Sequence, residues 1–462
     1  MRKWAVLPAG PGRDDYYPLE VSRSKAGVLQ LVGEWGRAET LYRRDLESVR
    51  RTADDRLVAD GENALGRFLL QNNSFAESGD LFRSALERYR GIGDAAAVAR
   101  MTGCIGDIYS SQGEYGTALE WFERQLRLAQ DAGDRRTVKR SMTAAAIIHA
   151  EQGRLDQALG IYRQVLAEAE REHDPRAVAD MEGEIGVIHL YRQDHQAALR
   201  SMERQLALAT RLGDVRSMGV AYCNLGILHS NLARPAEAMR CFVAYLGIVR
   251  KLGDRRSIGI ALGNIGVEHL DHGRYGEALA CFAEKYTIAA QLGDKHGQSI
   301  VLGDLGELYR LQGDTAKAAD HLDRAIALGR ELQMRNYLGG QIKSRAELCL
   351  MLGGADGANA WNDEASALAG EMNQAPLAFS CRLLKARILA LTDAAAAEAL
   401  LGELAAGERD DERQADIQYT LFQVCGSAAA RESAIGRYAS LDRKATSFKY
   451  RSRLDELAGS GS

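Results

Sequence analysis

Four histidines recur at a fixed spacing, and imidazole is a common metal ligand and proton carrier near neutral pH. They stand 40 residues apart, at His149, His189, His229 and His269. Zinc needs its ligand nitrogens within about 2 Å, whereas neighbouring packed helices lie about 8–10 Å apart. Tyrosines occupy the same position at Tyr109 and Tyr309. The column therefore favours packing positions over a metal site, and we expect no stoichiometric metal and no cofactor.

A column of arginines also repeats, and guanidinium groups suit carboxylate or phosphate partners. Its members are Arg56, Arg136, Arg176, Arg216 and Arg256. An aspartate stands two residues before each of these arginines, so local pairing and solvation explain the column equally well. We favour the solvated edge over a binding site.

Enzyme signatures are missing from the sequence. There is no GxxxxGK[ST], HExxH or GxSxG motif, and no GxGxxG after a strand pattern. The seven cysteines are scattered and form no CxxC pair, as expected of reduced thiols. We predict a cytoplasmic protein that is not an enzyme, and its arginine- and alanine-rich composition suggests a bacterial source.

Charge and hydropathy exclude two classes of partner. The net charge of −4 offers no overall field for nucleic acid. No run of about 18 apolar residues could cross a membrane, and Pro8 and Pro11 interrupt the short apolar stretch at the N-terminus. Whether the terminal GSGS is native stays open.

The positions of the glycines reveal a 40-residue repeat. Gly-Asp pairs begin at Gly93, Gly133, Gly213, Gly253 and Gly293, with His173-Asp174 and Ala53-Asp54 in the same register. A second glycine column falls midway, at Gly33, Gly113, Gly153, Gly273, Gly313 and Gly353. Glycine allows a left-handed helix end and aspartate caps the following helix. Each unit is therefore predicted to be a helix, a turn and a second helix.

Apolar columns define how the two helices of a unit, helix A and helix B, would pack. Helix A holds a Leu/Ile-Gly pair, ending at Gly66, Gly106, Gly186, Gly226, Gly266 and Gly306. Helix B holds a small residue, such as Ala118, and four positions later a bulky one, such as Phe122. We expect the small residue to face the glycine, and the bulky residue to fill the space between neighbouring units.

These columns resemble the tetratricopeptide repeat (TPR), and the spacing and phrases such as FAEKYTIAAQLGDKHGQ resemble its LGN/Pins-like subclass. The match covers about Val21 to Gly353. The resemblance implies an all-α fold, a right-handed superhelical solenoid with helix A lining its concave groove. The expected domains are an N-terminal extension (1–20), a TPR solenoid of about eight to nine repeats (21–370), and degenerate TPR-like helices with a C-terminal cap (371–462).

The groove can be read from positions around the Leu-Gly pair. The residues predicted to face inward are Glu184, Val187, Tyr191, Cys223, Asn224, Ile227, Asn231, Asn264, Val267, Asp304 and Glu307. An apolar floor carrying amide and acid groups suits a bound peptide. The alternative for each residue is packing between repeats. The asparagine that the LGN class often has directly after the glycine is absent here, so that contact does not carry over.

Two functions fit these features. The first is a scaffold or adaptor that holds a protein or peptide segment in the concave groove. The second is a bacterial sensor whose solenoid binds a small ligand or signalling peptide and controls a partner protein. Neither the partner nor the oligomeric state follows from the sequence.

Overall fold

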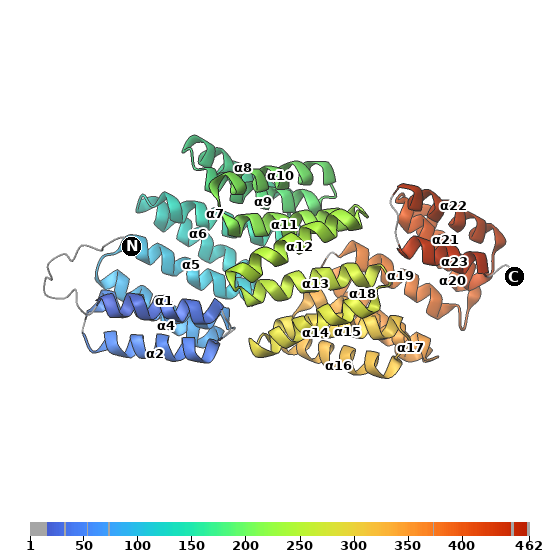
Figure 1. Ribbon diagram of the computed structural model, residues 1–462, viewed down its shortest axis with the longest axis horizontal. Helices are drawn as coiled ribbons and strands as arrows, with labels where there is room; N and C mark the ends of the chain where they lie inside the picture. Colours follow the sequence, from blue (N-terminus) through green and yellow to red (C-terminus); the bar gives the residue numbers. More distant parts are fainter. Residues whose placement is uncertain are drawn as a thin grey trace. The chain divides into compact units, whose positions relative to one another are not determined.

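The computed structural model describes residues 16–31, 34–52, 54–72, 74–372, 374–444 and 448–459. Most of the predicted N-terminal extension, together with Gly33, Ala53 and the last three residues of the GSGS end, lies outside the described residues. The described residues form 23 α-helices and no strand (Figure 1). None of these helices is long and apolar enough to cross a membrane.

Helices alternate as the repeat predicts. The helices that take the A position are α1 (Tyr16–Leu31), α3 (Asp55–Gln71), α5 (Ala95–Ser111), α7 (Arg135–Glu151), α9 (Pro175–Tyr191), α11 (Val215–Asn231), α13 (Arg255–Asp271), α15 (Lys295–Leu311) and α17 (Arg335–Met351). Those that take the B position are α2 (Trp35–Arg50), α4 (Phe75–Gly91), α6 (Tyr115–Asp131), α8 (Leu155–Arg171), α10 (His195–Leu212), α12 (Pro235–Leu252), α14 (Tyr275–Gln291), α16 (Thr315–Glu331) and α18 (Ala355–Glu371). The 40-residue period ends there. The remaining helices are α19 (Ala375–Leu389), α20 (Ala394–Gly407), α21 (Asp411–Cys425), α22 (Ala428–Lys444) and α23 (Phe448–Gly459).

Turn chemistry fixes the helix ends, as predicted. Gly93 has a φ of 74°, and the side chain of the following Asp94 accepts a hydrogen bond from the Ala97 N–H. His173 takes the same left-handed conformation without being a glycine, with a φ of 53°. The turns therefore depend on local backbone preferences that each repeat carries in its own sequence.

Packing against the helix-A glycine differs from the expectation. A Cβ on Gly106 would lie 2.8 Å from the Phe122 ring, and one on Gly66 would lie 2.7 Å from the Phe82 ring. The bulky residue of helix B, not the small one, therefore occupies the space above the glycine. The small column is fully buried close by, where the Ser78 hydroxyl donates to the Gly66 carbonyl at 2.8 Å. Glycine is needed at this position because the aromatic ring lies against helix A where a Cβ atom would otherwise be.

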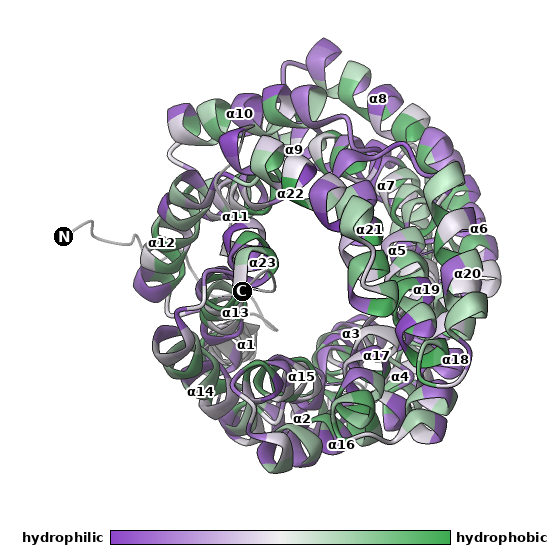
Figure 2. Ribbon diagram, turned by 90° about the vertical axis from the view of Figure 1, so that its right-hand side faces the viewer, coloured by the Kyte–Doolittle hydropathy of each residue, from purple (hydrophilic) through white to green (hydrophobic). Residues whose placement is uncertain are grey.

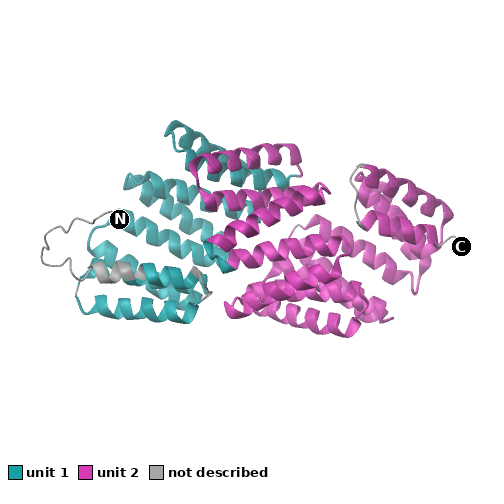
Figure 3. Cartoon of the chain, in the orientation of Figure 1, with its two compact units in different colours: residues 1–192, 252–255 teal, residues 193–251, 256–462 magenta. Residues whose placement is uncertain are grey.

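The chain divides into two compact units (Figure 3). Unit 1 comprises residues 1–192 and 252–255, and unit 2 comprises residues 193–251 and 256–462. In unit 1, α5 contacts α3 and α7, and in unit 2, α17 contacts α15 and α19. The B helices α4, α6 and α8 in unit 1, and α16 and α18 in unit 2, each pack against the helices on both sides of them in the sequence. Helix A therefore lies on the inner side of the curve of each unit and helix B on the outer side (Figure 2). The predicted all-α solenoid of helix-turn-helix repeats is confirmed.

Candidate functional site

One face of each helix A is directed to the inner side of the curve. The residues of α3 that line a cavity in unit 1 show which sequence positions form this face. On α3 the residues Asp60, Ala64, Arg67 and Gln71 line a single cavity of ≈ 540 Å³ together with Asn63. Their spacing of four, three and four residues places them along one face of the helix. We call this series of positions, in every helix A, the helix-A stripe. In unit 2 it comprises Val220, Asn224, Ile227 and Asn231 on α11, and Ile260, Asn264, Val267 and Asp271 on α13.

The stripe on α11 and α13 is an apolar surface that solvent reaches. The side chains of Val220 and Ile260 are 46% and 48% exposed, and Val267 is 39% exposed. Ile227 is half-buried and packs against the cluster of Ala238, Phe242 and Ile265. Exposed valine and isoleucine at equivalent positions of adjacent repeats would lose water on contact with an apolar partner.

Two carboxamides lie within this apolar surface. Asn224 and Asn264 are both half-buried, one repeat apart. The Asn264 Nδ2 donates to the Cys223 Sγ at 3.6 Å, a weak bond that leaves most of the carboxamide available. Burial raises the pKa of the Cys223 thiol to about 11, so it stays protonated near neutral pH. Cys223 is therefore a small neutral contact rather than a nucleophile.

Asp304 is held in an ion pair between repeats. The Lys285 Nζ on α14 lies 3.0 Å from the Asp304 Oδ2 on α15, and the lysine side chain is only 12% exposed. A Cβ on Gly263 would lie 2.7 Å from the Lys285 Nζ, so the lysine passes over this glycine to reach its partner. Asp304 thus helps to join repeats, although it lies on the stripe.

Glu307 belongs to a second charged cluster. The Arg310 guanidinium contacts both Glu307 oxygens, at 2.9 and 2.6 Å, and lies 3.2 Å from the Glu347 Oε2 on α17. Burial would raise the pKa of Glu307, but the hydrogen bonds from Arg310 outweigh it and hold that pKa below its usual range. The stripe therefore changes character within unit 2, from apolar and amide-bearing on α11 and α13 to paired charges on α15 and α17.

The three remaining predicted residues lie on α9, in unit 1. The Tyr162 hydroxyl donates to the Glu184 Oε2 at 3.3 Å, and burial raises the pKa of Glu184. Val187 is half-buried, and Tyr191 is 60% exposed at the end of the helix. The structure thus divides the predicted set between the two units, with Glu184, Val187 and Tyr191 in unit 1 and the other eight residues in unit 2.

Sequence reasoning missed three residues that shape this face in unit 2: Val220, Ile260 and Lys285. The first two stand four residues before Asn224 and Asn264, so helical spacing from the predicted asparagines could have found them. Lys285 gives no such signal, because it is a helix-B residue that reaches the stripe only through the space above Gly263.

On α5 and α7 of unit 1 the stripe carries an ion pair. The Arg140 Nη2 lies 2.8 Å from the Asp107 Oδ2. Burial raises the pKa of Asp107 against the opposing effect of Arg140 and Arg67. The stripe on α5 and α7 therefore combines an ion pair with an exposed apolar residue, Ile147.

The histidine column lies at the ends of the helices in the A position, half-buried. Burial lowers the pKa of His229, and the nearby Arg234 lowers it further; burial and Arg274 do the same for His269. Among the described residues no three metal-ligating side chains gather at one point. Half-buried positions at the helix ends agree with the packing interpretation favoured from the sequence. The absence of bound metal stays a prediction.

Two side chains of the arginine column, those of Arg56 and Arg256, pair with the following repeat. The Arg56 Nη2 lies 2.6 Å from the Asp94 Oδ2, and the Arg256 Nε lies 3.5 Å from the Asp294 Oδ2. In both cases the partner is the capping aspartate of the next repeat, about 38 residues on, not the aspartate two residues earlier. At these two positions the solvated edge also links neighbouring repeats.

Comparison with known proteins identifies what this chain is similar to. Residues 94–171 and 257–331 match the sequence family described as tetratricopeptide repeat. No curated protein matches the sequence.

Three solved structures have a similar fold at low sequence identity. A Rap protein complexed with Competence and Sporulation Factor has a TM-score of 0.54 and 15% identity, over 78% of this chain and 99% of that one. The Rap conjugation gene regulator of plasmid pLS20, in complex with the Phr* peptide, has a TM-score of 0.50 and 16% identity, over 62% and 77%. The apo form of the quorum sensor NprR from B. thuringiensis has a TM-score of 0.50 and 16% identity, over 76% and 99%. At these identities the likeness extends to the fold alone.

Proposed function

We propose that this chain, which is a tetratricopeptide repeat protein, is a binding scaffold that holds a peptide segment of a partner protein on the helix-A stripe of unit 2. The observation that carries the proposal is the surface on α11 and α13. There Val220, Ile260 and Val267 are exposed to solvent, and Asn224 and Asn264 lie among them.

This surface matches the chemistry of an extended peptide. Apolar side chains of the peptide would cover the exposed valine and isoleucine groups. The carboxamides of Asn224 and Asn264 can each donate to a peptide carbonyl and accept from a peptide N–H. Asn224 makes no hydrogen bond with any described residue, so its carboxamide is open to a ligand. The LGN/Pins-like subclass remains part of this proposal.

The double substitution Asn224→Ala with Asn264→Ala tests this function. Leaving a buried peptide group unpaired costs about 1–3 kcal/mol, so partner affinity should fall at least about tenfold. The partner would first be recovered by pulldown from the native host, and the affinity then measured by isothermal titration. The substitution Gln130→Ala, which removes an exposed carboxamide from the outer helix α6, should leave the affinity unchanged.

A melting curve separates binding from packing. If the two asparagines contact a ligand, the double variant should melt close to the parent protein because its groove is open to water. Unchanged affinity together with a large drop in melting temperature would mean that the asparagines pack the repeats together, and that the binding face lies elsewhere.

A regulatory sensor is the second candidate, and two of the similar folds favour it by name: one is a conjugation gene regulator in complex with a peptide, and another is a quorum sensor. For this chain a sensor would change its dimensions when the ligand binds. Small-angle scattering with and without the recovered ligand distinguishes the two candidates, since compaction supports the sensor and unchanged dimensions support the scaffold.

A further inference from the structure

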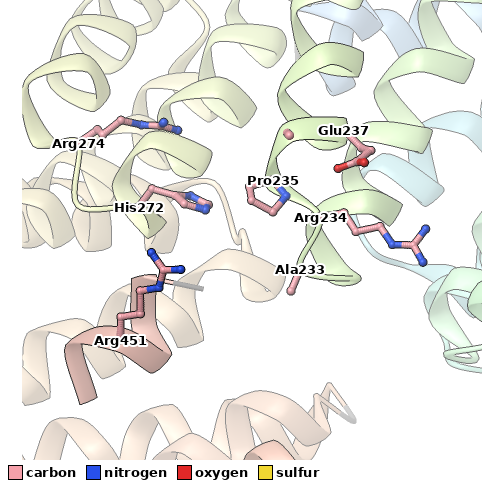
Figure 4. Close-up of a pocket in the computed structure, with 8 residues that line it drawn as sticks. Ala233, Arg234, Pro235, Glu237, His272, Arg274 and Arg451 are labelled. Carbon is pink, nitrogen blue, oxygen red and sulfur yellow. The ribbon is translucent and has the colours of Figure 1, made fainter. Parts of the chain in front are cut away.

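A pocket in unit 2 lies away from the helix-A stripe, between two repeat turns and the C-terminal helix. It has a volume of ≈ 450 Å³ and is lined by Ala233, Arg234, Pro235, Ala236, Glu237, His272, Arg274 and Arg451 (Figure 4). Its walls are the turn between α11 and α12, the turn between α13 and α14, and α23. We call it the turn pocket. Its size falls within the range of about 300–1,000 Å³ that is typical of small-ligand clefts.

Side chains from the turn between α13 and α14 and from α23 are directed into this space. Figure 4 shows the side chains of Arg274, His272 and Arg451 pointing toward its centre, with Glu237 across from them and Arg234 pointing away. No carboxylate lies within ion-pair distance of the Arg274 guanidinium among the described residues. With the described residues Arg451 makes one long contact, with Asp442 at 3.5 Å, which leaves most of its donors unused there.

His272 is oriented by its own helix end. Its Nδ1–H donates to the Glu268 carbonyl at 2.7 Å, which leaves Nε2 as the ring nitrogen available to the pocket. The Glu268 carboxylate is itself buried and accepts from the Ser230 hydroxyl at 2.9 Å. The imidazole therefore has a fixed position on the wall of the pocket.

The first turn of α12 adds backbone donors. The N–H groups of Ala236 and Glu237 have no acceptor within the helix, and the helix dipole is positive at this end. Pro235, at the first helical position, has no N–H to contribute. Two guanidinium groups, an imidazole and a helix N-terminus thus surround the pocket. Two carboxylates stand against them: Glu237 lines the pocket, and the Glu268 carboxylate lies 3.6 Å from the His272 Nδ1.

We propose that the turn pocket binds a phosphate group, either as the free ion or as an ester on a small molecule. Arg274 and Arg451 hold its oxygens through charge-assisted hydrogen bonds, and the first turn of α12 supplies further donors. Because Arg451 belongs to α23 and Arg274 to the turn before α14, the bound phosphate also links the C-terminal helix to the central repeats of the same unit.

Titration of the full chain with inorganic phosphate, in a chloride buffer, tests the site by calorimetry. We expect one saturable site with a Kd of roughly 1 mM or tighter. Arg274→Gln and Arg451→Gln should each weaken binding at least about tenfold. Glu237→Gln should tighten it by removing a repulsive carboxylate. The control Arg250→Gln, which changes an exposed arginine further along α12 that pairs with Glu284, should bind like the parent protein.

Hydrogen exchange gives an independent measurement. Phosphate should slow amide exchange in α23 of the parent protein and leave that exchange unchanged in Arg274→Gln, while melting curves check that each variant is folded. A parallel titration with methyl phosphate distinguishes the source, since tighter binding of the ester indicates an esterified ligand and tighter binding of the ion a free one. No saturation below roughly 10 mM, or equal affinity in all variants, overturns the proposal.

Discussion

At the scale of the residue, the decisive contact is an aromatic ring lying on a glycine. Gly106 on α5 and Phe122 on α6 make this contact, and Gly66 and Phe82 make the same contact one repeat earlier. A glycine within a helix costs roughly 1 kcal/mol relative to alanine, so its recurrence needs a compensating contact. The ring provides this contact by burying its face against the backbone of helix A.

Gly106→Ala should destabilise the protein, because the new Cβ would lie 2.8 Å from the Phe122 ring. The ring cannot retreat easily from a close-packed interior, and overpacking of this kind costs about 1–3 kcal/mol. Gly160→Ala on α8 is the matched control. No atom lies within 4 Å of its added Cβ, so higher helix propensity should stabilise it by about 0.5–1 kcal/mol. Urea unfolding of both variants checks the prediction, which fails if the two substitutions act in the same direction.

At the scale of the element, the end of each helix in the A position meets the start of the next helix B. The half-buried His229 ends α11 and His269 ends α13, while Arg234 and Arg274 stand just before the following helices. A helix C-terminus favours a protonated histidine. Here burial and the adjacent arginine outweigh the dipole, and the pKa of both imidazoles is lowered.

This arrangement predicts the pH dependence of stability. Because the folded pKa lies below the unfolded one, the unfolded chain binds more protons, and the free energy of unfolding should fall as the pH drops below about 6.5. Asp271, whose pKa is raised to about 6, acts in the opposite sense, because the folded chain then binds the extra proton. Substituting His229→Gln and His269→Gln together should reduce the loss of stability between pH 7 and 5.5, as measured by urea unfolding. An unchanged pH profile would mean that these histidines contribute no linkage.

At the scale of the whole molecule, each repeat is stabilised mainly by its neighbours. The last 40-residue repeat, α17 with α18, is covered by α19. Cys381 on α19 joins a buried cluster with Ile342 and Ala365, and the Asn362 Nδ2 donates to the Cys381 carbonyl at 3.1 Å. Buried residues of α18 and α19 thus share one cluster on both sides of residue 370, and the domain boundary expected there stays a prediction.

Removal of residues 371–462 should loosen α17 and α18, because their buried clusters with α19 would be exposed to water. Because each repeat is stabilised mainly by its direct neighbours, the loosening should not reach distant repeats. Helices α5 and α6, many repeats away in the chain, therefore serve as an internal control. Hydrogen exchange should become faster in Arg335–Glu371 and stay unchanged in Ala95–Asp131. Unchanged exchange in α17 and α18 would show that the segment from 371 onward is a separate domain.

The sequence by itself determined the helices, their turns and the period. These features depend on local physics that every repeat carries: a glycine with positive φ at Gly93, a capping aspartate at Asp94, and apolar positions at helical spacing. It also placed Asn224 and Asn264 at equivalent positions of two adjacent repeats, because they stand 40 residues apart, while their role in binding stays a proposal.

Tertiary structure decided what each position contacts. The Phe122 ring, not the small residue Ala118, is the nearest group to Gly106, Arg56 pairs with the next repeat, and Lys285 reaches the stripe from helix B. The turn pocket joins Arg274 to Arg451, far along the chain. These contacts depend on the distances that packing sets between helices. The 40-residue period shows which positions are equivalent in successive repeats, but it does not show which side chains meet.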